Sequence, residues 1–105
     1  MANICNNDFY LCCENTEVLH KIIDKFDNLF ENVLYGELYN SDDVFIDGYF
    51  ESRWSFPIHL FENFFDEFEN EDIYMRCLST EYGCDYVAMN IYKNGVWQEE
   101  QTFNL

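Results

Sequence analysis

Hydrophobic and polar residues recur along the chain with two different periods, and each period predicts its own kind of element. Residues 7–13 (NDFYLCC) are rich in aromatic and β-compatible side chains and predict a first strand. From Val18 to Phe30 the apolar positions follow helical spacing, which predicts a helix with Asn15 or Thr16 as its N-cap. The chain therefore opens with a strand followed by a helix.

The pattern is less regular in the next stretch. Residues 31–43 fit either an extension of the first helix or a short strand, and both alternatives stay open. Residues 44–54 predict a second strand, with a kink or bulge near Gly48, which has no side chain to pack.

Residues 57–70 predict a second amphipathic helix that begins at Pro57, with Ser55 as a candidate N-cap. Its apolar face is mostly aromatic and its polar face mostly acidic. The apolar face comprises Ile58, Leu60, Phe61, Phe64, Phe65 and Phe68. Burial of these side chains is expected to dominate the stability of the helix.

The last third of the chain predicts three strands, at residues 73–80, 85–92 and 96–101. Asn94-Gly95 between the last two is a strong signal for a two-residue hairpin turn. The expected order is β-α-β-α-β-β-β in a single domain spanning residues 1–105. This order predicts an α+β, two-layer, ferredoxin-like sandwich, with two helices on one face of a four- or five-stranded, mostly antiparallel sheet.

The net charge limits the kinds of molecule that the chain is expected to bind. The chain carries 21 acidic and 5 basic residues, for a net charge of −16. Direct binding to nucleic acid or to an anionic membrane is disfavoured because both depend on clusters of Lys and Arg. The charge favours either a basic partner protein or simply a solvated acidic surface.

The cysteines and the chain start favour a cytoplasmic protein with reduced thiols. The five cysteines form no CxxC pair, and most are expected to be small core residues. MANICNND has neither the basic start nor the apolar core of a signal peptide, and no apolar run is long enough for a membrane helix.

The polar face of the second helix is the main candidate for partner binding. Six carboxylates fall within 11 residues, without an intervening Lys or Arg: Glu62, Asp66, Glu67, Glu69, Glu71 and Asp72. Like charges four residues apart destabilise a helix, and acids at its C-terminal end oppose its dipole. On a continuous helix such carboxylates would recur about every 6 Å, as a mimic of the nucleic-acid backbone requires. The alternative is a solvated acidic face.

Arg53, Arg76 and Trp54 form an alternative ligand-binding set on the sheet, in which the arginines would hold a carboxylate or phosphate. The arginines could equally serve as counterions within the acidic surface. We expect no metal site and no cofactor, since the acidic residues lack the calcium-loop pattern and His20 and His59 lack ligand spacing. No catalytic motif is present, so we expect no enzyme.

Three short segments resemble one family. MANICNN at the start, SRWSFP before the second helix, and STEYG followed by a strand with a late tryptophan resemble the YubB-like ferredoxin-fold family of small plasmid and phage proteins. The matching positions are Ala2, Asn3, Cys5, Asn7, Trp54, Ser55 and Pro57, with Phe56 standing between the last two. The resemblance implies a ferredoxin-like fold and a mobile-element origin. It brings no catalytic residues.

These observations favour a non-enzymatic acidic interaction protein of a phage or plasmid. It would occupy the basic site of a nucleic-acid-binding protein, such as a host defence nuclease or a repressor, and thereby exclude the nucleic acid. The alternatives are a small-ligand or peptide-binding module that uses the open sheet face, and a structural homo-oligomer. The oligomeric state is left open.

Overall fold

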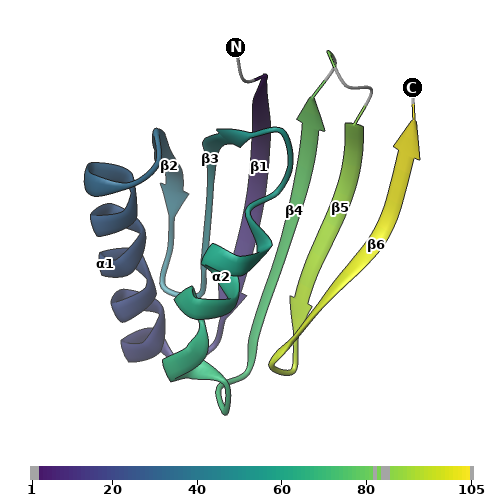
Figure 1. Cartoon of the computed structure of the whole chain (residues 1–105). Helices are drawn as coiled ribbons and strands as arrows, with labels where there is room; N and C mark the ends of the chain where they lie inside the picture. Colours follow the sequence, from purple (N-terminus) through teal and green to yellow (C-terminus); the bar gives the residue numbers. More distant parts are fainter. Residues whose placement is uncertain (1–2, 82, 84–85, 105) are drawn as a thin grey trace.

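The computed structural model describes residues 3–81, 83 and 86–104 (Figure 1). In chain order the elements are β1 (Ile4–Cys13), α1 (Thr16–Asn32), β2 (Gly36–Ser41), β3 (Phe45–Arg53), α2 (Ile58–Phe64), the 3-10 helix η1 (Asp66–Phe68), β4 (Ile73–Glu81), β5 (Tyr86–Lys93) and β6 (Val96–Asn104). None of the described helices is long and apolar enough to cross a membrane.

The strands form one open antiparallel sheet in the order β2-β3-β1-β4-β5-β6. Both α-helices lie against the same face of this sheet (Figure 1), as the sequence predicted for an α+β fold. The sheet has six strands rather than four or five, because residues 36–41 form an edge strand. The observed order is β-α-β-β-α-β-β-β. It is not the β-α-β-β-α-β order of ferredoxin-like folds, because β5 and β6 follow β4.

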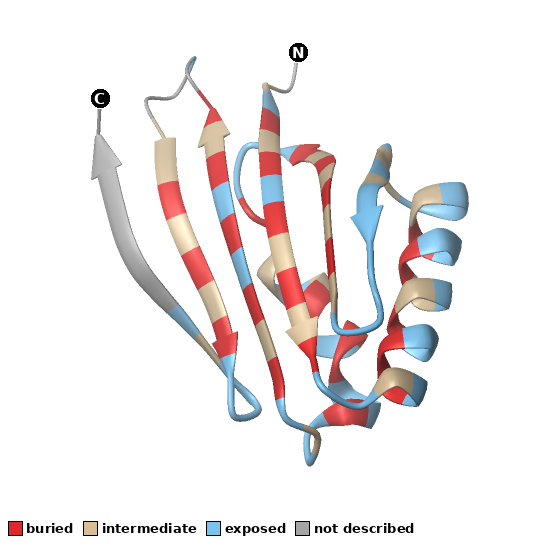
Figure 2. Cartoon of the chain, turned by 180° about the vertical axis from the view of Figure 1, so that it is seen from behind, coloured by how far each residue is buried: buried red, intermediate tan, exposed pale blue. Residues whose placement is uncertain are grey.

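Burial alternates along the central strands with the period of two that a sheet with one covered face requires (Figure 2). We call the face opposite the helices the open face. The predicted irregularity near Gly48 lies in the partner strand, where the register of β2 shifts between Leu38 and Asn40. Gly48 itself is needed for close approach: a Cβ there would lie 2.5 Å from the carbonyl oxygen of Glu37.

Helix α1 supports one half of the core. Asn15 is its N-cap, and the Asn15 side chain accepts a hydrogen bond of 3.2 Å from the Val18 backbone N–H. Phe26 is fully buried and stacks on Phe9 of β1, with ring centroids 4.8 Å apart. The capped, amphipathic sequence thus explains both where α1 starts and which face it buries.

The β5–β6 hairpin turns as predicted. Asn94 and Gly95 have φ angles of 54° and 77°, so both central residues of the turn are in the left-handed region that a type I′ turn requires. The hairpin carries Tyr92 and Trp97 on the helix side of the sheet, where their ring centroids are 5.2 Å apart.

Candidate functional site

The predicted second helix is not continuous, which corrects the expectation from its periodicity. Helix α2 ends at Phe64, and the chain tightens into η1 before it turns toward β4. Lys25 of α1 donates a hydrogen bond to the Phe64 carbonyl, the group that would accept from the Phe68 N–H in an α-helix. The Phe68 N–H bonds the Phe65 carbonyl instead, at 2.9 Å. A contact with α1 thus accompanies the break, and acids near the end of α2 oppose continuation.

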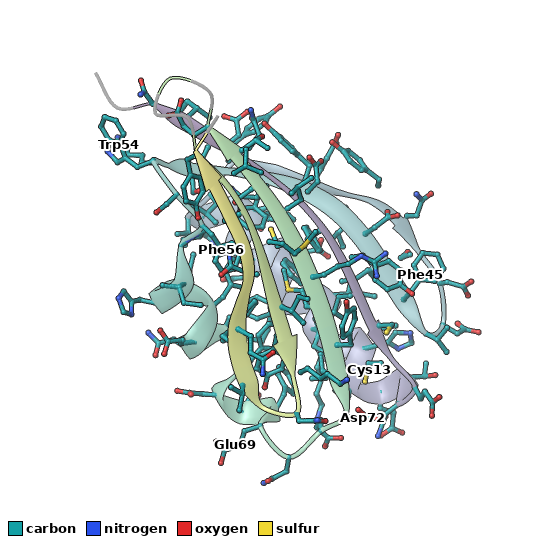
Figure 3. The ribbon with its side chains drawn as sticks, turned by 90° about the vertical axis from the view of Figure 1, so that its right-hand side faces the viewer. Cys13, Phe45, Trp54, Phe56, Glu69 and Asp72 are labelled. Carbon is teal, nitrogen blue, oxygen red and sulfur yellow. The ribbon has the colours of Figure 1, made fainter. Side chains whose placement is uncertain are left out.

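Because α2 is short, the six predicted carboxylates do not form one row along a rigid axis. Glu67 pairs with Lys25 at 2.9 Å and ties η1 to α1. Asp72 turns toward the end of β1, where it lines a depression with Cys13 (Figure 3), and Glu71 is half-buried nearby. The other three carboxylates, Glu62, Asp66 and Glu69, face the β5–β6 hairpin.

These three carboxylates converge on one depression of about 340 Å³, which we call the acidic pocket. Its lining comprises Glu62, Phe65, Asp66, Glu69, Tyr92, Gly95, Val96 and Trp97. Phe65 and Tyr92 stack in its wall with centroids 4.4 Å apart, and none of its described lining residues is basic. Burial, together with the negative charges of Glu69 and Asp66, raises the pKa of the Tyr92 hydroxyl. Carboxylates beside aromatic faces suit a guanidinium or ammonium group.

A second depression of about 580 Å³ continues from the first, and we call it the amide pocket. Its lining comprises Ser55, Phe56, Ile58, Glu62, Tyr86, Asn90, Trp97 and Gln98. Glu62 and Trp97 line both pockets. Figure 3 shows Phe56 on the helix side of β6, between Trp54 at one end of the molecule and Glu69 at the other.

Two buried nitrogens in the wall of the amide pocket lack a hydrogen-bond partner within the part of the chain that the structure describes. They are the side-chain Nδ2 of Asn90 and the indole Nε1 of Trp97. Asn90 is only 6% exposed. Its position in the buried phase of β5, between Ala88 and Tyr92, is the sequence signal that could have drawn attention to it.

The alternative ligand-binding set does not form one site, because Arg76 lies far from Arg53 and Trp54. Arg53 lies opposite Ile4 in the β1–β3 register, whereas Arg76 lies opposite Tyr10 in the β1–β4 register. Six residues of β1 separate these positions, which corresponds to about 20 Å. Arg76 packs over the Tyr10 ring on the open face, 4.4 Å from its centroid.

Trp54 accompanies Arg53 at the edge where β3 ends. It is 48% exposed, and its φ of 70° lies in the left-handed region that bulky residues rarely adopt. Trp97, in contrast, packs against Phe56 with centroids 5.2 Å apart. Trp97 is thus packed among the aromatic side chains, while Trp54 sits in the connection between β3 and α2.

A buried polar network that the sequence analysis missed crosses the centre of the sheet. Asn7 is fully buried, and its Nδ2 donates to the Ser52 hydroxyl at 2.9 Å. The Ser79 hydroxyl donates to Asn7 Oδ1 at 2.6 Å. The network ties β1 to β3 and β4, and because its side-chain groups are satisfied it has a structural role.

The cysteines and histidines offer no assembled reactive centre among residues 3–81, 83 and 86–104. Cys5, Cys13 and Cys77 are buried as predicted, and burial raises the pKa of each thiol. The fifth cysteine, Cys84, lies outside the described residues. His20 and His59 are exposed on α1 and α2. No described group of His, Cys, Asp and Glu is arranged to hold a metal ion.

Comparison of the chain with protein-family models, with curated proteins and with solved structures finds no match. The resemblance to the YubB-like family stays a prediction that rests on the residues that carry it.

Proposed function

We propose that this chain is a non-enzymatic, cytoplasmic acidic protein of a phage or plasmid, which binds a basic nucleic-acid-handling protein and competes with nucleic acid for it. The observation that carries the proposal is the convergence of Glu62, Asp66 and Glu69 on one pocket with aromatic walls. A Lys or Arg side chain that normally holds a phosphate would find carboxylates and ring faces there.

The uncompensated charge supports the same function. Within the described residues, the ion pair between Lys25 and Glu67 is the one that joins a Lys or Arg to a carboxylate. The net charge of −16 is therefore largely uncompensated within the chain. It attracts basic surfaces of other molecules over about a Debye length and speeds their association. The mimicry that we propose uses a compact corner rather than a long row of charges along a helix.

The proposal predicts that the acidic pocket, and not charge alone, retains the partner. The test compares two triple variants that remove the same number of charges: Glu62→Gln/Asp66→Asn/Glu69→Gln in the pocket, and Asp24→Asn/Asp27→Asn/Glu31→Gln on the outer face of α1. Each tagged protein captures binders from a host lysate, with washes from about 50 mM to about 500 mM salt. We expect the parent and the α1 variant to retain a basic nucleic-acid-binding protein that added DNA displaces.

The pocket variant should lose most of this retention at low salt. Equal loss in both triple variants would assign binding to the overall field and remove the pocket from the proposal. Retention that is insensitive to salt and to DNA would contradict mimicry itself.

A second candidate function is favoured by the open face. Leu78 is 40% exposed there, beside Met89 on β5 and Asp8 on β1 in the cross-strand register. A peptide-binding module or a homo-oligomer would cover this face. An Arg76→Ala variant that loses partner binding, or a mass that rises with protein concentration, would favour these alternatives.

A further inference from the structure

The amide pocket, whose lining includes the residues of the two unpaired nitrogens, shares Glu62 and Trp97 with the acidic pocket. Asn90 Nδ2 and Trp97 Nε1 are buried hydrogen-bond donors with no described acceptor. Buried donors without partners are costly, and folded proteins contain few of them. Two in the wall of one pocket therefore mark a place where an acceptor oxygen from outside the chain would be stabilised.

The two pockets form a single groove between α2 and the β5–β6 hairpin. Glu62 and Trp97 line both, so the pockets meet at these residues. The groove runs from Gly95 at the hairpin turn to Ser55 before α2. Its hairpin end offers carboxylate acceptors, and its other end offers N–H donors along an aromatic wall.

The chemistry of the groove selects its occupant. A phosphate or carboxylate would satisfy the donors but would meet Glu62 in the same pocket and the charges of Asp66 and Glu69 in the adjoining one, which is repulsive. A peptide carbonyl is a neutral acceptor, and a basic residue on the same segment supplies the cation that the carboxylates need. Both nitrogens are buried, so binding requires that side chains of the wall move to admit the carbonyl.

We propose that the groove binds a basic peptide segment of the partner protein. An Arg or Lys side chain enters the acidic pocket, and a backbone carbonyl of the same segment accepts hydrogen bonds from Asn90 and Trp97. This inference rests on the proposed function for the acidic pocket and adds the form in which the partner is recognised.

The test uses three small probes and the nuclear magnetic resonance signal of the Trp97 indole N–H. Nα-acetyl-arginine amide carries both the cation and the carbonyl, butylguanidinium carries only the cation, and Nα-acetyl-glutamine amide carries only the carbonyl. The probes are titrated into ¹⁵N-labelled protein, and a Trp54→Phe variant assigns the second indole signal. We expect millimolar binding of acetyl-arginine amide, about tenfold tighter than butylguanidinium, because two further hydrogen bonds form.

The Trp97 indole proton and the Asn90 amide protons should move downfield with acetyl-arginine amide and stay in place with butylguanidinium. If both cations bind equally and the indole signal does not move, the peptide inference is overturned while the acidic pocket survives. If neither cation binds, both the peptide inference and the binding role of the acidic pocket in the proposed function are contradicted.

The variant Asn90→Leu separates a binding role from a structural one. We expect acetyl-arginine amide to bind this variant no more tightly than butylguanidinium, and the melting temperature to rise because an unpaired buried amide is removed. Asn63→Leu, the same exchange on the exposed side of α2, should leave the affinity unchanged. A lower melting temperature with unchanged affinity for Asn90→Leu would show that Asn90 serves the fold, and would overturn the inference.

Discussion

The two helices cover the same sheet face but are held in different ways. Helix α1 spans 17 residues, has a side-chain N-cap and buries five apolar residues. Helix α2 spans seven residues, and its N-cap position, Pro57, makes no side-chain hydrogen bond. The α1 half of the molecule, which is α1 with β1–β3, contains a helix that its local sequence favours. The α2 half, which is α2 and η1 with β4–β6, contains a helix that depends on contacts from elsewhere in the chain.

The difference indicates which part of the molecule is suited to binding a partner. The network of Asn7 at the centre of the sheet is satisfied, and the Phe26 ring of the α1 half is fully buried. The α2 half contains the groove, the unpaired nitrogens of Asn90 and Trp97 and three converging carboxylates. Departures from local consistency of this kind are expected at functional sites rather than in the supporting core.

The largest effects should come from the aromatic core that the halves share. Phe26→Ala and Phe61→Ala each remove a fully buried ring, and each should lower the free energy of unfolding by about 3–5 kcal/mol. The two should differ in what they do to Trp97, whose ring centroid lies 6.2 Å from that of Phe61.

In a Trp54→Phe background, urea denaturation measures stability and fluorescence reports on Trp97 alone. Phe61→Ala should shift the emission of the folded state to the red, whereas Phe26→Ala should leave it unchanged. Equal shifts would mean that the two halves respond as one unit.

Most of the framework could be predicted from the sequence because it rests on local patterns. The aromatic and β-compatible side chains of residues 7–13 located one central strand, residues 73–80 were predicted as another, and helical periodicity after Asn15 or Thr16 located α1. The pair Asn94-Gly95 fixed the hairpin because both residues tolerate positive φ. Strand β2 was left ambiguous because it is an edge strand with little burial, which erases the alternation.

The candidate site was harder to predict because it depends on tertiary contacts. The acidic residues were visible in the sequence, but their placement depends on the end of α2 and on the contact that Lys25 makes there. Asn90 and Trp97 were not singled out as site residues, because their unpaired nitrogens become apparent only when β5 and β6 pack against α2. Sequence periodicity predicts single helices and strands, whereas the groove is formed by several of them packed together.

A smaller effect is expected from the contact that links the halves. Lys25 donates to the Phe64 carbonyl, pairs with Glu67 and lies 4.9 Å from the centroid of the Phe64 ring. Lys25→Met should lower the free energy of unfolding by about 1–2 kcal/mol, since a charge-assisted hydrogen bond is lost. Glu67→Gln should cost less than about 1 kcal/mol because the pair is largely exposed.

A double-mutant cycle in urea measures the coupling of Lys25 to Glu67. Coupling below about 1 kcal/mol, together with a larger loss for Lys25→Met alone, would assign the main role to the carbonyl contact. A full loss in Glu67→Gln would assign it to the ion pair and contradict this account of where α2 ends.

The smallest expected effect concerns alkaline pH and is confined to the α2 half. The folded pKa of Tyr92 lies above its ordinary value of 10.0, through burial and then through Glu69 and Asp66. A raised folded pKa means that the unfolded chain releases the proton first. The stability from the neutral hydroxyl is therefore complete below about pH 10 and is lost as the pH rises through the folded pKa.

Asp66→Asn/Glu69→Gln should lower the pKa of Tyr92 toward its ordinary value, because two of the negative charges that oppose ionisation are gone. Asp24→Asn/Asp27→Asn on α1 should leave it in place. The ¹³Cζ resonance of Tyr92, followed from about pH 8 to about pH 12, measures both. If the α1 double variant lowered this pKa as far as the pocket double variant, the pKa of Tyr92 would depend on the net charge of the molecule. The acidic pocket would then have no local electrostatic effect of its own.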